Sequence, residues 1–590
     1  MICFLCIRGT SRLCLYLYFS FTTCVSVNFH LVSPSLKDNS KELYDTDNML
    51  VSPITNIIAN LKVNIIFSQR HDVKCHLYTR SGVGIRKKRR EKEEDSSLTN
   101  LQHKYSPTMP EVVEEMKKIW DISFPVAAMS LLNYLKNMTS VACIGRLGSL
   151  ELAGGALAVG FTNITGYSVL SGLATGMEPL CGQAIGSKNP SLASLTLKRT
   201  IFLLLLASLP ISLLWLSLQP LMLILRQQED ITRVASLYCS FSLPDLLANS
   251  FLHPLRIYLR CKGTTWPLMW CTLVSVLLHL PITAFFTFYI SLGVAGVAVS
   301  SFLTNFISLL LLLCYIYLEE HKSDKTSSSL CLKMPLLLSS SRDSCNDEVW
   351  STLIKFAVPS CIAVCLEWWW YEFMTVLAGY LPEPRVALAA AAIVIQTTSL
   401  MYTIPTALSA AVSTRVSNEL GAGRPEKART AAAVAVVAAV AVSVFGLVGT
   451  TVGRKAWGRV FTADGVVLEL TAAVLPVIGA CELANCPQTT SCGILRGSAR
   501  PRVGAKINFY AFYVVGAPVA VILAFVWGLN FMGLCYGLLG AQIVCAISIL
   551  TVVYKTDWNK ESLKAHDLVG KNVILPDIDQ IIVKCEEGTH

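Results

Sequence analysis

The stretch TLIKFAVPSCIAVCLEWWWYEFMTVL, from Thr352 to Leu377, indicates what class of fold this chain has. It is largely apolar and long enough to cross a bilayer, which takes roughly 20 apolar residues at about 1.5 Å each. Glu367 lies somewhat past its middle. An ionised carboxylate at that depth costs on the order of 2.5–3.5 kcal/mol on insertion scales. Glu367 is therefore a candidate proton or ion relay, and the alternative is an acid that only hydrogen-bonds a neighbouring helix.

The rest of the chain has the composition of a polytopic membrane protein. Of its 590 residues 53% are hydrophobic and only 15% are charged, which soluble domains rarely reach. In hydrocarbon every backbone polar group must be satisfied within its element, and these runs are too long for barrel strands. We expect an all-α fold with twelve transmembrane helices, near 119–142, 152–179, 196–220, 232–258, 267–290, 294–318, 352–377, 386–410, 430–452, 466–491, 508–528 and 533–554.

The regions around these spans differ in character. Residues 1–108 are broken and polar, and we interpret them as an atypical, disordered extension. Lys and Arg gather in alternate loops, which predicts that those loops and both termini are cytoplasmic. The net charge of +10 is therefore explained without a nucleic-acid partner, and the 21 cysteines show no metal-ligand spacing. We expect an N-lobe over 109–320, a cytoplasmic loop over 321–350, a C-lobe over 351–555 and a cytoplasmic tail over 556–590.

An internal repeat relates the two lobes. GQAIGSKNP at 182–190 matches SNELGAGRP at 417–425 with an offset of 235, and Leu259-Arg260 recurs as Leu495-Arg496 with an offset of 236. Six helices per half give both halves the same orientation about an axis along the membrane normal. Two pseudo-symmetric lobes around a cleft are typical of a transporter.

Other polar residues at membrane depth accompany Glu367. Glu482, Asn485 and Gln488 follow one another at a spacing of three, so they share a face of the tenth span. We predict that this stripe, in a helix broken by Pro487, lines the cleft, with interhelical hydrogen bonding as the alternative. Glu372 points about 140° away from Glu367 round the helix and either takes part or reaches water at the outer end.

Weaker candidates lie on other spans. Asp245 follows a proline in the fourth span. Trp368 and Tyr371 flank the acid of the seventh span and can present ring faces to a cation, although aromatic residues also belt membrane interfaces. His279 stands alone in the fifth span and is expected to be a packing residue. Because desolvation disfavours the charged form of a carboxyl, a proton and a cationic substrate can compete for one acid, which gives antiport.

Four motifs together resemble one family. They are MEPLCGQA (177–184) after the second span, CLEWWWYE (365–372), RVSNELGAG (415–423) after the eighth span and GILRG (493–497) after the tenth. On these the chain, over about 110–555, resembles the plant multidrug and toxic compound extrusion (MATE) transporters, the DETOXIFICATION proteins. The residues that carry the motif loops are Glu178, Gln183, Asn418, Glu419 and Arg496.

The resemblance implies proton- or sodium-driven export of organic compounds by alternating access through two six-helix lobes. It implies that Glu367 is the exchange site, while a second family acid maps onto Asn485, which is an amide here. Either Glu482 takes over or one carboxylate suffices. The absence of further acids favours protons over Na⁺.

The resemblance also sets expectations for partners and location. We expect a monomer without cofactor or resident metal, which moves a small organic substrate such as a xenobiotic, a secondary metabolite or a plant hormone. The membrane is expected to be the plasma membrane or an endomembrane (vacuole, Golgi or endosome).

Other classes fit the sequence less well. A major facilitator transporter would carry a Gly-x-x-x-Asp-Arg-x-Gly-Arg-Arg loop after the second span, where this chain has GSKNP at 186–190. A membrane-embedded enzyme would need His, Ser or paired Asp at membrane depth, and His279 has no such partner in the sequence. The sequence therefore predicts an exporter and not an enzyme, with sodium coupling as the alternative to proton coupling.

Overall fold

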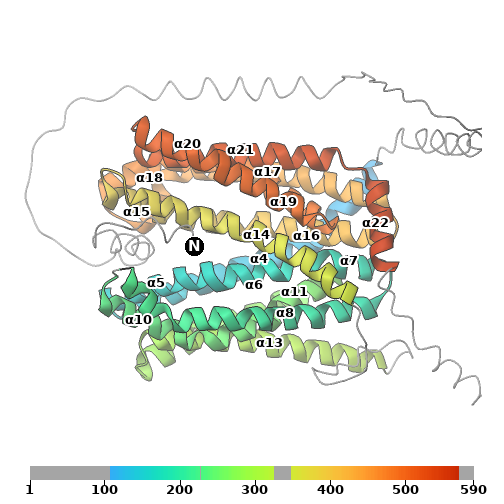
Figure 1. Cartoon of the computed structure of the whole chain (residues 1–590), viewed down its shortest axis with the longest axis horizontal. Helices are drawn as coiled ribbons and strands as arrows, with labels where there is room; N and C mark the ends of the chain where they lie inside the picture. The colour runs from blue at the N-terminus through green and yellow to red at the C-terminus, as the bar shows by residue number, and fades with distance from the viewer. Residues whose placement is uncertain (1–106, 226, 325–346, 571–590) are drawn as a thin grey trace, which may run out of the picture. The chain divides into compact units, whose positions relative to one another are not determined.

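The computed structural model describes residues 107–225, 227–324 and 347–570, and in this part every regular element is a helix (Figure 1). Of the extension predicted over residues 1–108, residues 1–106 lie outside the described part of the chain. The same holds for residues 325–346 of the predicted inter-lobe loop and for the tail beyond residue 570.

We call the helices before residue 325 the N-lobe. Its elements are α4 (Met109–Gly145), α5 (Ser149–Thr162), the π-helical segment η2 (Asn163–Tyr167), α6 (Ser168–Thr175), α7 (Glu178–Gly186), α8 (Pro190–Leu216), α9 (Leu218–Ile224), α10 (Glu229–Phe241), α11 (Leu243–Cys261), α12 (Thr265–Ala284), η3 (Phe285–Tyr289) and α13 (Val294–Asp324).

We call the spans from residue 347 onward the C-lobe. Its elements are α14 (Asp347–Ala378), α15 (Pro384–Met401), α16 (Thr403–Gly421), α17 (Pro425–Phe461), α18 (Gly465–Gly497), α19 (Pro501–Asn508), η4 (Phe509–Gly516), α20 (Ala517–Val521), η5 (Ile522–Val526) and α21 (Asn530–Tyr554). One more helix, α22 (Trp558–Gly570), follows the last span.

Ten helical stretches of the described residues are long and apolar enough to cross a membrane, and they coincide with ten of the twelve predicted spans. The other two predicted spans are also helical. The first is α4, which begins with a charged segment, and the fourth is divided between α10 and α11 at Ser242. The all-helical, multi-pass fold predicted from hydrophobicity is therefore confirmed.

Four helices end in the same way, and these endings give the sequence repeat its structural meaning. Lys188, Gly263, Gly423 and Ala499 each have a φ between 59° and 89°, in the left-handed region. The next residue then donates its N–H to the carbonyl five residues back, at 2.8–3.0 Å in all four cases. This is the Schellman ending. Residues 188 and 423 are repeat equivalents, as are 263 and 499, so the repeat preserves the way the chain turns back into the membrane.

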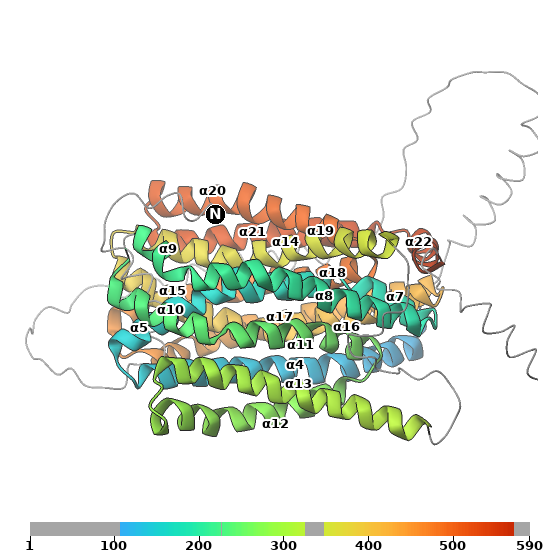
Figure 2. The ribbon, with the colours of Figure 1, turned by 60° about the horizontal axis from the view of Figure 1, so that its bottom comes forward.

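The lobes meet along defined pairs of helices. Helix α6 lies against α14, α7 lies against α16, and α4 lies against α16 and α17. Helix α22 was not predicted from the sequence, and it contacts α7 of the N-lobe as well as α16 and α17 of the C-lobe. Figure 2 shows α22 at the same end of the bundle as α7 and α16. Its buried side chains are Ala565, Val569 and Glu561.

Candidate transport site and lobe interface

Glu367 lies within α14 and is partly buried, between the C-lobe helices. The hydroxyl of Tyr402, at the junction of α15 and α16, lies within hydrogen-bonding reach of its carboxylate. Arg496 of α18 is close enough to interact with it electrostatically. The acid therefore faces a polar interior made by three helices of its own lobe, and not lipid alone.

The predicted polar stripe of the tenth span exists, but its helix is not broken. Helix α18 continues through Pro487, because neighbouring groups in membrane helices can satisfy the backbone carbonyl that a proline leaves unpaired. Asn485 Nδ2 donates to Glu482 Oε2 at 3.0 Å, and Glu482 interacts electrostatically with Glu367. Gln488 is fully buried, and neither atom of its amide has a hydrogen-bond partner among the described residues.

The aromatic residues beside Glu367 point into different surroundings. Trp368 is 39% exposed, whereas Trp370 is completely buried in the C-lobe core. Trp369 Nε1 donates to the carbonyl of Ile164 in the N-lobe at 3.3 Å. Such a spread is expected, because consecutive residues of a helix are turned by about 100°. Of this run, Tyr371 lines a pocket.

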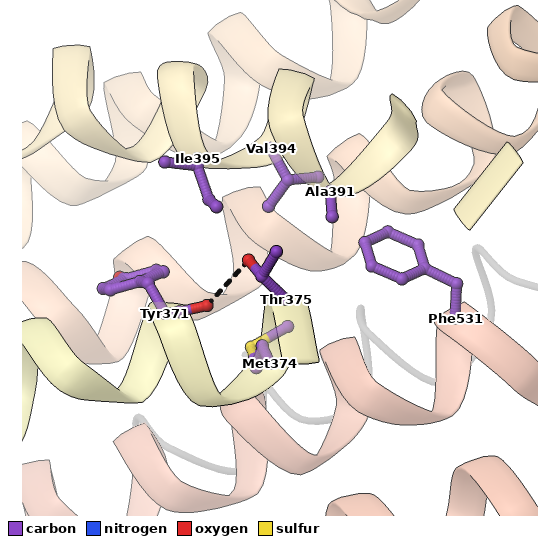
Figure 3. A pocket seen from close by; sticks show the side chains of 7 residues that line it. All are labelled: Tyr371, Met374, Thr375, Ala391, Val394, Ile395 and Phe531. Carbon is purple, nitrogen blue, oxygen red and sulfur yellow. Dashed lines mark hydrogen bonds between the residues drawn. The ribbon is translucent and has the colours of Figure 1, made fainter. Parts of the chain in front are cut away.

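That pocket is a small apolar cavity of the C-lobe (Figure 3). Tyr371 and Thr375 of α14 line it from one side, and Thr375 Oγ1 donates to the backbone carbonyl of Tyr371 at 3.0 Å. Glu372, the next residue of α14, is partly buried but does not line the cavity. The remaining lining residues are Met374, Ala391, Val394, Ile395 and Phe531.

The N-lobe contains a separate buried polar network around Asp245. Its carboxylate accepts hydrogen bonds from Tyr167 OH at 2.5 Å and from Asn305 Nδ2 at 2.7 Å. The side-chain oxygen of Asn305 accepts a hydrogen bond from Lys136 Nζ at 3.1 Å. Helices α4, α11 and α13 and segment η2 thus each contribute one residue. Lys136 was missed from the sequence, although a lone lysine at membrane depth is a signal in itself.

His279, expected to be a packing residue, is part of the same region. Its Nε2 lies 2.9 Å from Ser140 Oγ and its Nδ1 lies 2.8 Å from Thr304 Oγ1. Both ring nitrogens therefore have hydroxyl partners, which supports a structural role.

A buried ion cluster joins the two lobes at the end where α7 and α16 meet. Glu178 of α7 forms an ion pair with Arg260 of its own lobe. From the C-lobe, Ser413 Oγ donates to Glu178 Oε2 at 2.6 Å and Arg496 Nε lies 3.6 Å from the same oxygen. Ser413 is the repeat equivalent of Glu178, and Arg496 that of Arg260. Repeat-related residues therefore meet across the pseudo-two-fold axis.

The same symmetry governs two amide side chains. Gln183 of the N-lobe donates to the carbonyl of Gly497 at 3.3 Å, and its repeat equivalent Asn418 donates to the carbonyl of Cys261 at 3.1 Å. The backbones approach so closely that a Cβ on Gly186 would lie 2.1 Å from Asn418 O. Likewise, a Cβ on Gly421 would lie 2.2 Å from Gln183 O. Only glycine fits at these two positions.

A second ion cluster lies beside the first. Arg415 of α16 contacts Glu115 of α4 through Nε and Nη2, at 2.7 and 2.9 Å, and contacts Glu419 at 2.6 Å. Arg424 Nε lies 2.7 Å from Glu419 Oε2. We call these ion and amide contacts between α4, α7, α11, α16 and α18 the inter-lobe cluster.

These positions correct one prediction. The motif residues Glu178, Gln183, Asn418, Glu419 and Arg496 were expected in loops, but they lie on α7, α16 and α18. These segments are polar, so the hydrophobic periodicity that predicts a helix ends before them. The periodicity ends there because the side chains face polar partners of the other lobe and not lipid. The helices continue, and the motif is a lobe interface.

Comparisons with known proteins agree with this architecture. The MatE family model matches residues 125–285 and 359–522, one segment in each lobe. The chain is 90% identical to Protein DETOXIFICATION 55 of Arabidopsis thaliana over 499 residues, which cover 84% of this chain and 99% of that protein. It is 46% identical to Protein DETOXIFICATION 51 of the same plant over 498 residues, which cover 83% and 91%.

Solved structures show the same fold. The crystal structure of the eukaryotic MATE transporter AtDTX14 matches with a TM-score of 0.71 at 29% identity, over 78% of this chain and 99% of that one. A multidrug resistance MATE family transporter in an outward-facing conformation matches with a TM-score of 0.66 at 16% identity, over 77% and 96%. The fold and the relatives define a multi-pass membrane transporter and not an enzyme. The chain belongs to the MATE family, as the motifs predicted.

Proposed function

We propose that this chain is a proton-coupled antiporter that exports small organic compounds by alternating access, with Glu367 as the proton exchange site. The observation that carries the proposal is the setting of Glu367. It is a carboxylate inside a membrane-spanning helix, it forms no ion pair among the described residues, and it faces Tyr402 and Arg496. Desolvation disfavours the charged form of a carboxyl, so a carboxyl among membrane helices takes up a proton more readily than one in water.

Arg496 supports a link between this acid and the lobes' movement. Its Nη2 donates to Ser409 Oγ at 2.7 Å, its Nε faces Glu178, and it interacts with Glu367. One guanidinium therefore lies between the exchange site and the inter-lobe cluster. When Glu367 is ionised it attracts Arg496 away from Glu178, and when it is protonated it releases that cation to the cluster.

The charge pattern of the loops supports an orientation. The inter-lobe cluster lies beside basic loops, among them those with Lys188, Lys262, Arg424 and Arg500. Basic loops remain in the cytoplasm. We therefore place this end, and both termini, on the cytoplasmic side. In that orientation the lobes are joined at the cytoplasmic end, as an exporter requires before it releases its cargo outside.

The second candidate is a sodium-coupled exporter. It is supported by the carboxylates of Glu367 and Glu482 and the amide of Asn485 in one region, because oxygen ligands suit hard cations. With either ion the protein works as a monomer in the lipid bilayer without a cofactor or a nucleic-acid partner. Its cargo is a xenobiotic, a secondary metabolite or a plant hormone, and its membrane is the plasma membrane, the vacuole, the Golgi or an endosome.

The test is transport into inside-out vesicles under an imposed pH gradient, with a panel of radiolabelled organic cations and weak acids. We expect Glu367→Gln to abolish gradient-driven uptake, because glutamine keeps the size but cannot exchange a proton. Glu469→Gln, an exposed acid on α18, is the matched control and should leave uptake unchanged. Undiminished uptake by Glu367→Gln would rule out this residue as the exchange site. Uptake driven by a Na⁺ gradient at constant pH would favour the second candidate.

A further inference from the structure

The buried network of the N-lobe has an excess of positive charge. Besides Lys136 and Asp245 it includes Arg256 of α11, which interacts electrostatically with both. Two histidines border it, His253, which interacts with both cations, and His279. If the histidines are neutral, two cations face a single carboxylate.

The carboxylate of Asp245 is already occupied. One of its oxygens is bonded by Tyr167 and the other by Asn305, so Lys136 reaches it only through the amide of Asn305. Lys136 is buried, with 8% of its surface exposed. An ammonium has three donors, and only the bond to Asn305 is formed with described residues. Lys136 therefore has unused donors inside the lobe.

Within the described part of the chain, the guanidinium of Arg256 has even fewer hydrogen-bond partners than the ammonium of Lys136. Its Nε is buried without a hydrogen-bond partner, and the guanidinium takes part in no ion pair among the described residues. A buried donor without a partner costs about 1–3 kcal/mol, so Arg256 favours a ligand that accepts hydrogen bonds. The planar fork of a guanidinium matches both oxygens of a carboxylate, which a spherical ion cannot do.

We propose that Lys136 and Arg256 form an anion site in the N-lobe that binds the carboxylate of a small organic acid, the cargo of this transporter. The inference rests on the proposed function for the statement that the bound acid is cargo, but not for the binding itself. Proton and cargo then occupy different lobes, since Glu367 belongs to the C-lobe. Their exchange is coupled through the movement of the lobes and not through competition for one carboxylate.

Binding to the purified protein in nanodiscs tests the site without a gradient. The probes are three molecules of nearly one shape: benzoate, neutral benzamide and cationic benzylammonium. We expect benzoate to bind and to raise the melting temperature, and the other two to do neither. Binding of benzylammonium in preference to benzoate would overturn the proposal. A competition series with chloride distinguishes a carboxylate site from a general halide site, because displacement of benzoate by equimolar chloride would also overturn it.

Variants then locate the site. We expect Lys136→Gln and Arg256→Gln each to weaken benzoate binding by about tenfold or more, as truncation of one member of a buried charge pair does. Arg146→Gln, an exposed arginine ten residues beyond Lys136 at the C-terminal cap of α4, should bind as the native protein does. Unchanged benzoate affinity in both buried variants would refute the assignment. If either variant fails to fold, the three-probe comparison on the native protein still decides.

The same preparations separate this proposal from the proposed function. Glu367→Gln should keep benzoate binding while it loses gradient-driven transport. If benzoate binding depends on Arg256 but transport survives Glu367→Gln, the anion site stands and the proton site fails. If transport depends on Glu367 but only cations bind, the anion site fails alone.

Discussion

The two lobes share a helical arrangement but differ in the sign of charge that predominates among their buried polar residues. Cations predominate in the N-lobe network, and carboxylates predominate around Glu367 in the C-lobe. Tyr167 and Tyr402 are repeat equivalents, 235 residues apart. Each lies at an irregularity of its span, at segment η2 in the N-lobe and at the junction of α15 and α16 in the C-lobe. Tyr167 donates to Asp245, in a network with the cations of Lys136 and Arg256. Tyr402 faces Glu367, which has the second acid Glu482 nearby.

The difference shows what a duplicated fold keeps and what it changes. The helix endings, an interruption within the second span of each lobe and the reciprocal contacts of Gln183 and Asn418 are found in both halves. The acids are not, since Asp245 lies on the fourth helix of one lobe and Glu367 on the first helix of the other. The same helical scaffold can therefore hold different charged residues in each lobe. The free energy of an intramembrane charge depends on the side chains around it, and these differ between the lobes although the backbone arrangement recurs.

We expect the largest effect on stability from a substitution that removes the carboxylate of the N-lobe network. Asp245→Ala leaves Lys136 without its counter-charge, so we expect a loss of about 3–5 kcal/mol in the free energy of unfolding, as for other broken buried pairs. Glu482→Gln in the C-lobe should cost only about 1 kcal/mol, because its partner Asn485 is neutral. Unfolding of the purified variants in SDS measures both. Adding Lys136→Met to Asp245→Ala should restore much of the loss, and equal losses in the two lobes would contradict the comparison.

The second prediction tests the symmetry of the inter-lobe cluster. Gly186→Ala and Gly421→Ala each place a methyl against the backbone of the other lobe, so we expect each to cost about 1–3 kcal/mol and to part the lobes at this end. Hydrogen exchange of peptides that cover α7 and the end of α16 should become faster in both variants. Gly449→Ala is the control, since a Cβ there meets no atom within 4 Å. A change in only one of the two variants would show that the contact is not reciprocal.

The third prediction concerns α22, the helix that contacts both lobes. Val569 packs against the N-lobe core, and Val569→Ala removes two buried carbon groups at about 0.8 kcal/mol each. We expect a loss of about 1.5 kcal/mol and faster hydrogen exchange in α22. Leu563→Ala on the same helix is the control, because Leu563 is 69% exposed. If both substitutions have the same effect, α22 is not held by its buried face.

The smallest effect compares two equivalent kinds of helix ending. Gly423 and Ala499 both have left-handed backbones, and a Cβ on Gly423 meets no atom within 4 Å. Gly423→Ala should therefore destabilise by about 1 kcal/mol through backbone conformation alone, and Ala499→Gly should not destabilise. Thermal unfolding of both variants checks the signs. A destabilised Ala499→Gly would show that chain entropy outweighs the strain.

Much of the fold could be predicted from the sequence, because a membrane-spanning segment must be apolar, about 20 residues long and helical. All twelve predicted spans lie in helices, and the repeat of 235 residues corresponds to recurring helix ends. The prediction was wrong where helices leave the hydrocarbon. The sequence predicts loops for the motif segments around Glu178 and Asn418, but they are helical, and their polar side chains face the other lobe. Helix α22 was missed because its apolar face is short.

The sequence by itself determined the class, the family and the acid in α14, because length, hydrophobicity and motif spacing are local properties. Only the tertiary structure decided which polar groups meet. It brought Glu178 to Ser413 and Arg496 across the lobes, and it brought Lys136 within one amide of Asp245. The physical reason is that the free energy of a buried charge depends on the partners within a few ångströms. Some of those partners are far apart in the chain, since Asn305 lies 60 positions from Asp245 and Arg415 lies 300 positions from Glu115.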